Sequence, residues 1–235
     1  MEPGDLRPFA PGDRTRRINW RAAARRGELY VTRFQEERNA DVVLLLDVLS
    51  DCGVPPRSCL DLGVRAAATL AHAYLARKDR VGFVEFGGFL RWISPGTGRR
   101  QAEAIAEALL PAASHFSYVA PRLDRLPPRI LPDNAVVIAL SPLLDERFAD
   151  ALVDLVARRF DLVAIAISPI EAPRRMLGGS MPDDLACRLW TLEWRGRLDA
   201  LRGHGIAIVE WDGDVALEAA LAGLIYTRPR SAVRG

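Results

Sequence analysis

The residues whose types and spacing could do chemistry lie in one short stretch. Asp47, Ser50 and Asp51 place two carboxylates and a hydroxyl close together, directly after an apolar segment. Oxygen atoms of this kind are the ligands that Mg²⁺ prefers in proteins, so the stretch could hold a divalent cation. Alternatively, Asp51 caps the turn that follows and Asp47 accepts hydrogen bonds from loop amides, which is a structural role. The segment by itself leaves both interpretations open.

Motifs that would identify an enzyme are absent from the sequence. The glycines of residues 95–98 lack the third glycine of a dinucleotide-binding loop and the Gly-Lys-Ser/Thr of a P-loop. The three histidines, His72, His115 and His204, have neither zinc-protease nor catalytic-triad spacing. Asp145 precedes a helical pattern and is expected to cap that helix. We therefore expect no catalytic residues, no cofactor and no enzymatic activity.

An arginine-rich stretch near the N-terminus offers a second kind of chemistry. From Arg14 to Arg26 the chain carries several arginines and Trp20 but no acid, so this stretch could hold phosphates and stack on a base. Acidic residues flank it, however, and the whole chain has a formal net charge of only +2. The same arginines could instead bind carboxylates of the protein itself or of a partner protein. Nucleic-acid binding is the alternative.

Short apolar runs predict the strands that would position these residues. Residues 80–86 and 89–93 flank Gly87-Gly88, which predicts a hairpin with a two-residue turn. Residues 29–34 and 205–210 are weaker strand candidates. Three further runs are apolar on both faces and rich in β-branched residues, which is typical of interior strands in a parallel sheet: 41–47, 134–141 and 161–168.

Helical periodicity fills the segments between these runs. Apolar residues repeat at helical spacing in residues 60–77, 99–110, 146–159, 185–201 and 215–224. This alternation predicts an α/β, Rossmann-like fold: a mostly parallel sheet with one antiparallel edge strand and helices on both faces. Such sheets bind ligands at the carboxyl ends of their strands, where the strand order reverses. Asp47 and Asp51 fall at one of these strand ends.

The composition is typical of a folded protein in a reducing compartment. Nearly half of the 235 residues (49%) are apolar, enough for a sizeable core. Cys52, Cys59 and Cys187 lack the paired spacing of a zinc site or a disulfide framework, so we expect reduced thiols. The sequence shows no signal peptide and no apolar segment of membrane-spanning length. We expect a cytoplasmic location.

The N-terminal part of the chain resembles the signature of a bacterial family. The pattern R-x-Y-x-P-G-D-x-x-R-x-I-D-W-x-x-x-A-R of the domain of unknown function 58 family is similar to the stretch that contains Arg7, Pro11, Gly12, Asp13, Arg16, Ile18, Trp20 and Arg25. Ser168-Pro169-Ile170-Glu171 is similar to a later landmark of the family. The resemblance implies an N-terminal arm at residues 1–39 and a von Willebrand factor A-like domain at residues 40–235.

Domains of the von Willebrand factor A type often bind a divalent cation at a metal-ion-dependent adhesion site, where a partner's carboxylate docks. The resemblance maps the D-x-S-x-S element of that site onto Asp47, Leu49 and Asp51, its threonine onto Ser117 and its last aspartate onto Pro142. Leucine and proline side chains provide no ligand oxygen. We therefore expect a degenerate site, at which Mg²⁺ or Mn²⁺ binds weakly or not at all to Asp47, Ser50, Asp51 and Ser117.

The resemblance also implies a kind of partner. Genes of this family commonly neighbour MoxR-type AAA+ ATPases, which suggests a role in assembling or activating protein complexes. Family members usually carry two membrane segments and a further region upstream, so we expect this chain to be a truncated or shortened form. Our hypothesis is a non-enzymatic protein-interaction module that works with such an ATPase and docks it through residues 47–51, Ser117 and Pro142. A metal-dependent adhesion module and a nucleic-acid-binding protein are the alternatives.

Overall fold

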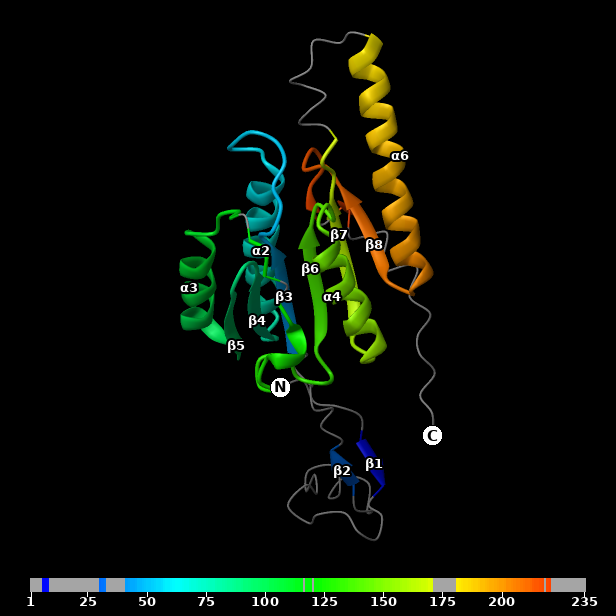
Figure 1. Ribbon diagram of the computed structural model, residues 1–235. Helices are drawn as coiled ribbons and strands as arrows, with labels where there is room; N and C mark the ends of the chain where they lie inside the picture. The colour runs from blue at the N-terminus through cyan, green and yellow to red at the C-terminus, as the bar shows by residue number, and fades with distance from the viewer. Residues whose placement is uncertain are drawn as a thin grey trace. The chain divides into compact units, whose positions relative to one another are not determined.

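Contacts within the chain divide it into two units, Met1–Asn39 and Ala40–Gly235. The computed structural model describes residues 6–8, 30–32, 41–115, 117–119, 121–170, 181–217 and 219–220. In the first unit, strand β1 (Leu6–Pro8) pairs antiparallel with β2 (Tyr30–Thr32). The second unit holds the main sheet and its helices (Figure 1).

The sheet of the second unit has the strand order β5-β4-β3-β6-β7-β8. Its members are β3 (Asp41–Asp47), β4 (Arg80–Phe86), β5 (Leu90–Gly96), β6 (Val136–Ser141), β7 (Asp161–Ile167) and β8 (Ala207–Trp211). All neighbours pair in parallel except β4 and β5, which form an antiparallel hairpin at one edge. The chain builds outward from β3 to β5 and then returns to β6 on the other side of β3. The strand order therefore reverses between β3 and β6, so their carboxyl ends mark the expected ligand-binding edge.

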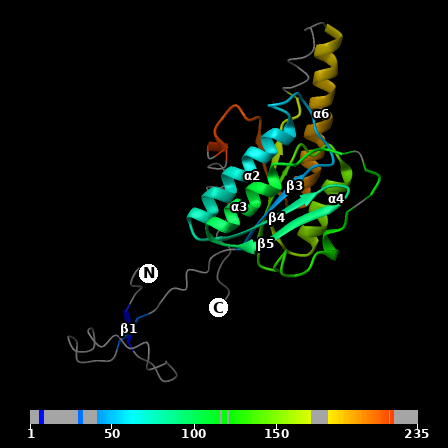
Figure 2. The same cartoon turned by 90° about the vertical axis from the view of Figure 1, so that its left-hand side faces the viewer.

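Two pairs of helices cover the two faces of the sheet (Figures 1 and 2). Helices α2 (Cys59–Ala76) and α3 (Gly98–Leu109) pack on one face, and α4 (Glu146–Ala157) and α6 (Met181–Gly203) pack on the other. Strand β3 shows why both faces must be covered. Its residues Val42, Leu44 and Leu46 face α2, whereas Val43 and Leu45 face α4, and all five are at most 2% exposed.

The observed architecture confirms the expected α/β fold class, including the antiparallel edge strand and the helices on both faces. One local prediction is wrong: the turn between β4 and β5 holds three residues, because Phe86 pairs with Leu90 and leaves residues 87–89 unpaired. The last predicted helix, at residues 215–224, lies mostly outside the described residues, as do residues 14–26.

Candidate functional site

The centre of the carboxyl edge is a buried carboxylate. Asp47 ends β3 and is 2% exposed. Its Oδ1 accepts a hydrogen bond from the Leu49 amide at 2.9 Å, and its Oδ2 accepts one from the Ser141 hydroxyl at 2.5 Å. Ser141 ends β6 and its Oγ in turn accepts the Leu143 amide at 2.7 Å. The reversal of strand order between β3 and β6 thus brings together two side chains that are far apart in the sequence.

Burial raises the pKa of Asp47 to about 7, well above its usual value of 3.8. Desolvation is the largest cause, because removing water disfavours the ionised form. The hydrogen bonds from Ser141 and Leu49 act in the opposite direction, and so does the positive charge of Arg147. Asp47 is therefore a group that changes charge near neutral pH.

Arg147 forms a second arrangement at the same edge, beside the buried carboxylate. Its guanidinium pairs with Asp145 through Nε at 2.9 Å and Nη2 at 2.6 Å, and its Nη1 donates to the carbonyls of Ser117 at 2.6 Å and Val119 at 2.9 Å. Asp145 also accepts the Arg147 amide at 2.9 Å as the N-cap of α4, which confirms its expected capping role. The ion pair holds the pKa of Asp145 below its usual value. Arg147 therefore fastens the loop of residues 117–119 to the start of α4.

Two of the other residues predicted at this edge, Asp51 and Ser117, have local structural roles. The Oδ1 atom of Asp51 accepts the amide of Leu60 in the first turn of α2 at 2.9 Å, so Asp51 stabilises the start of that helix. Ser117 accepts the Val119 amide through its Oγ at 3.1 Å. The hydroxyl of Ser50 is buried without a hydrogen-bond partner.

Two of the mapped ligand positions, Leu49 and Pro142, carry no side-chain oxygen, and the two carboxylates of the predicted set hydrogen-bond to groups of the protein itself. Both carboxylate oxygens of Asp47 already accept hydrogen bonds, and Asp51 is engaged at the start of α2. In the part of the chain that the structure describes, no three His, Cys, Asp or Glu side chains gather as a metal site would need. The resemblance maps the last ligand position onto Pro142. The residue that contacts the Asp47 carboxylate is instead Ser141, which precedes Pro142 in the sequence. The backbone carbonyl of Pro142 accepts the indole of Trp194 instead.

The turn after β4 lies close to two other loops, the one that follows β3 and the one that contains Ser117. A methyl group on Gly88 would lie 2.8 Å from the Ser117 hydroxyl, and one on Gly87 would lie 2.6 Å from Val48. The turn after β4 therefore packs against both neighbouring loops, which leaves room for glycine but not for larger residues.

Large apolar side chains are exposed on these packed loops. Phe89 is 85% exposed, Tyr118 is 91% exposed and Val119 is 53% exposed. We call these three residues the edge patch. Arg147 anchors the loop of residues 117–119 through two carbonyls, and the turn that carries Phe89 lies close to the same loop at Gly88 and Ser117. Exposed apolar clusters of this kind mark surfaces that bind other proteins.

A second exposed apolar surface lies on α6. Its members recur three or four residues apart, which places them on one face of the helix, and each is more than half exposed: Met181, Leu185, Leu189 and Leu192. We call them the α6 stripe. They are the natural comparison for the edge patch in a binding experiment.

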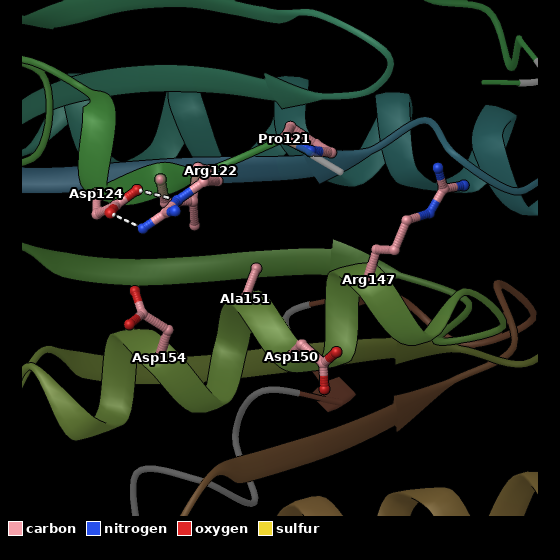
Figure 3. Close-up of a pocket in the computed structure, with 8 residues that line it drawn as sticks. Pro121, Arg122, Asp124, Arg147, Asp150, Ala151 and Asp154 are labelled. Atoms are coloured by element: carbon pink, nitrogen blue, oxygen red, sulfur yellow. Dashed lines mark hydrogen bonds and ion pairs between the residues drawn. The ribbon is translucent and has the colours of Figure 1, made fainter. Parts of the chain in front are cut away.

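A shallow pocket adjoins the Arg147 arrangement (Figure 3). It has a volume of about 230 Å³ between α4 and the segment around Leu123–Arg125, and it is lined by Pro121, Arg122, Leu123, Asp124, Arg147, Asp150, Ala151 and Asp154. Figure 3 shows Arg147 extending past the end of β6, away from Asp150 and Asp154. Its charged lining residues are two arginines and three aspartates, and the lining includes no hydroxyl, thiol or imidazole group.

Sequence reasoning found part of this site and missed the rest. It predicted the capping role of Asp145, and it predicted Asp47, Ser50, Asp51 and Ser117 as weak metal ligands, a role that stays a prediction; it singled out neither Ser141 nor Arg147. The Asp145-Glu146-Arg147 sequence directly after a predicted strand was the available signal for the arginine. Of the signature residues, Arg7 lies in β1; the others lie outside the described residues: Pro11, Gly12, Asp13, Arg16, Ile18, Trp20 and Arg25.

Similar proteins are found at the level of family, sequence and fold. The family model described as "Protein of unknown function DUF58" matches residues 5–174, which include the signature stretch. The uncharacterized proteins Mb1516 of Mycobacterium bovis and Rv1480 of Mycobacterium tuberculosis are each 26% identical over 111 residues, covering 46% of this chain and 35% of the relative. The chain thus matches about a third of the length of these relatives.

Among solved structures, the conserved hypothetical protein BatB from Bacteroides thetaiotaomicron is similar with a TM-score of 0.49 and 12% identity, over 78% of this chain and 94% of that chain. No helix among the residues that the structure describes has both the length and the apolar character needed to span a membrane.

Proposed function

The chain belongs to the DUF58 family, and on that basis we propose that it is a non-enzymatic protein-interaction module whose partner is a MoxR-type AAA+ ATPase. The choice of partner rests on the family resemblance. In this role the chain contributes a docking surface to the assembly or activation of protein complexes, and the ATPase supplies the chemical energy.

The observation that carries the proposal is the exposure of the edge patch at the carboxyl ends of the strands. Phe89, Tyr118 and Val119 present apolar area to solvent, and Arg147 anchors the loop of the last two through the carbonyls of Ser117 and Val119. A fixed apolar surface loses little conformational entropy when a partner binds, which favours recognition. The charged rim formed by Arg147 and Asp145, whose side chains are 28% and 19% exposed, would orient the partner.

Docking at this edge would not depend on a metal ion. At a functional adhesion site a cation joins the domain to a carboxylate of the partner. Here each Asp47 carboxylate oxygen accepts one hydrogen bond, from the Leu49 amide or the Ser141 hydroxyl, and two of the mapped ligand positions carry side chains without oxygen, Leu49 and Pro142. Apolar contact is then the main source of affinity, and we describe the edge as a degenerate adhesion site.

Co-purification of the whole chain with a MoxR-type ATPase from the same bacterium tests the proposal. The tagged chain should retain the ATPase, and the double variant Phe89→Ser, Val119→Ser should lose it. The matched control is Leu189→Ser, Leu192→Ser, which removes the same kind of side chain from the α6 stripe and should still bind. Failure of the unmodified chain to retain the ATPase, or loss of binding in the α6 control alone, would overturn the proposal.

A further inference from the structure

Two cysteines lie side by side at the beginning of α2. Cys59 is the first residue of that helix, and its amide donates a hydrogen bond to the carbonyl of Cys52 at 2.8 Å. Two residues that exchange backbone hydrogen bonds in an antiparallel ladder have Cα atoms about 5.5 Å apart, and a single backbone hydrogen bond holds two residues at a similar separation. This separation lies inside the range of about 4.4 to 6.8 Å that a disulfide requires. The backbone therefore already holds the two residues at bridging distance.

Both thiols point to the same neighbouring segment. The Sγ atom of Cys52 lies 3.4 Å from the carbonyl oxygen of Pro169, and that of Cys59 lies 3.7 Å from the carbonyl oxygen of Ser168. Since Ser168 and Pro169 are consecutive residues just after β7, the two sulfur atoms are directed into one small region. The geometry brings the sulfur atoms, as well as the backbones, together.

The two thiols differ in accessibility. Cys59 is 2% exposed, whereas Cys52 is only partly buried. Their acidities differ in the same direction: the neighbouring Cys59 side chain lowers the pKa of Cys52, whereas the neighbouring Cys52 side chain together with burial raises the pKa of Cys59. Cys52 is therefore the sulfur that a reagent in solution reaches first.

We propose that Cys52 and Cys59 are a reversible oxidation site, at which a low-molecular-weight disulfide converts the two thiols into one intramolecular disulfide. In the first step the Cys52 thiolate attacks the small disulfide, so that a mixed disulfide forms at Cys52 and one small thiolate leaves. In the second step the Cys59 sulfur gives up its proton, attacks the Cys52 sulfur and displaces the second small thiol. The two cysteines are oxidised by two electrons, and the small disulfide is reduced to two thiols.

The second step is favoured by the change that the first step makes. Once Cys52 is bonded to the small thiol, it no longer carries the negative charge that opposes ionisation of Cys59. The attacking sulfur is also held next to its target by the backbone, which replaces a collision between molecules by a reaction within one molecule. The mixed disulfide should therefore be short-lived in the unmodified chain.

Oxidised glutathione is the probe that tests this proposal, with mass spectrometry of the intact chain and of its peptides. The unmodified chain and Cys187→Ser should both lose two hydrogen atoms, give one peptide pair bridged through Cys52 and Cys59, and return to the starting mass with dithiothreitol. Cys187→Ser is the matched control, because Cys187 is also partly buried but lies on α6.

The two remaining single variants separate the steps. Cys59→Ser should accumulate a stable glutathione adduct at Cys52, because the displacing sulfur is gone. Cys52→Ser should form an adduct at Cys59 at least about tenfold more slowly, because Cys59 is buried. The proposal is overturned if the unmodified chain forms adducts without the Cys52–Cys59 bridge, if the bridge involves Cys187, or if the two single variants react at equal rates while both remain folded by circular dichroism.

Discussion

Replacing Asp47 with asparagine should remove a pH dependence of stability that the structure assigns to this one residue. Asparagine has the same shape, and its carbonyl oxygen can still accept the Leu49 amide while its amide can donate to the Ser141 hydroxyl. The substitution therefore leaves the packing in place and deletes the ionisation. The variant therefore tests the electrostatic role of Asp47 separately from the packing of its side chain.

The sign and size of the effect follow from the raised pKa. In the folded chain the pKa of Asp47 is about 7, against 3.8 for the ordinary value that applies after unfolding. Because the folded state holds the proton more tightly, this group contributes its full stability below pH 3.8, and that contribution is lost as the pH rises through 7. Between pH 8.5 and pH 5.5 the folded protein therefore gains about 2 kcal/mol from Asp47, a change of roughly thirtyfold in the folding equilibrium.

Urea unfolding followed by tryptophan fluorescence at the two pH values measures this gain. The unmodified chain should gain about 2 kcal/mol relative to Asp47→Asn on going from pH 8.5 to 5.5. Asp124→Asn is the control: its partner Arg122 holds the pKa of Asp124 below its usual value, so it should add no pH dependence in this window. If the free-energy difference between the unmodified chain and Asp47→Asn were equal at both pH values, Asp47 would not be titrating as a buried acid.

The remaining predictions concern the same edge of the sheet. Ser141→Ala should lower the free energy of unfolding by about 1–3 kcal/mol at pH 7, because it leaves a buried amide and a buried carboxyl without their partner; a loss under about 0.5 kcal/mol in urea unfolding would contradict the hydrogen-bond pattern. Arg147→Lys keeps the positive charge but loses the planar guanidinium that binds Asp145 and two carbonyls. Local opening of residues 117–119 should then cost about 1–2 kcal/mol less, so chymotrypsin should cleave after Tyr118 about 5 to 30 times faster than in the unmodified chain. Arg122→Lys is the control, and equal cleavage rates in Arg147→Lys and the unmodified chain would contradict the role of Arg147 in holding this loop. Mg²⁺ or Mn²⁺ at millimolar concentration should move the melting temperature by less than about 1 °C, whereas a larger shift abolished by EDTA would restore the metal-dependent alternative. Single-stranded DNA should give a flat titration at low salt, and salt-dependent binding that Arg16→Ala weakens would favour the nucleic-acid alternative.

The fold could be predicted from the sequence because its signals are local. Val42, Leu44 and Leu46 alternate with Val43 and Leu45 in one continuous apolar run, and such a run needs cover on both faces. The turn after β4 holds three residues because Phe86 pairs with Leu90, a register that the Gly87-Gly88 pair does not reveal.

The site was less accessible to sequence reasoning, since its contacts join distant residues. Ser141 reaches Asp47 across 94 positions, because β6 is placed beside β3 by the order of the strands. Arg147 lies two residues from Asp145, but its bonds to residues 117–119 depend on where that loop passes. The closeness of Cys52 and Cys59 likewise depends on the path of the loop between them, and their spacing alone matches no known motif.

The measurement that tests the central claim most directly is hydrogen exchange of the whole chain with and without the MoxR-type ATPase. Docking at the edge patch should slow exchange in peptides that contain residues 87–90 and 117–119, and it should leave peptides from the α6 stripe unchanged. Protection confined to the α6 stripe, or no protection at any peptide with the ATPase in excess, would contradict the account.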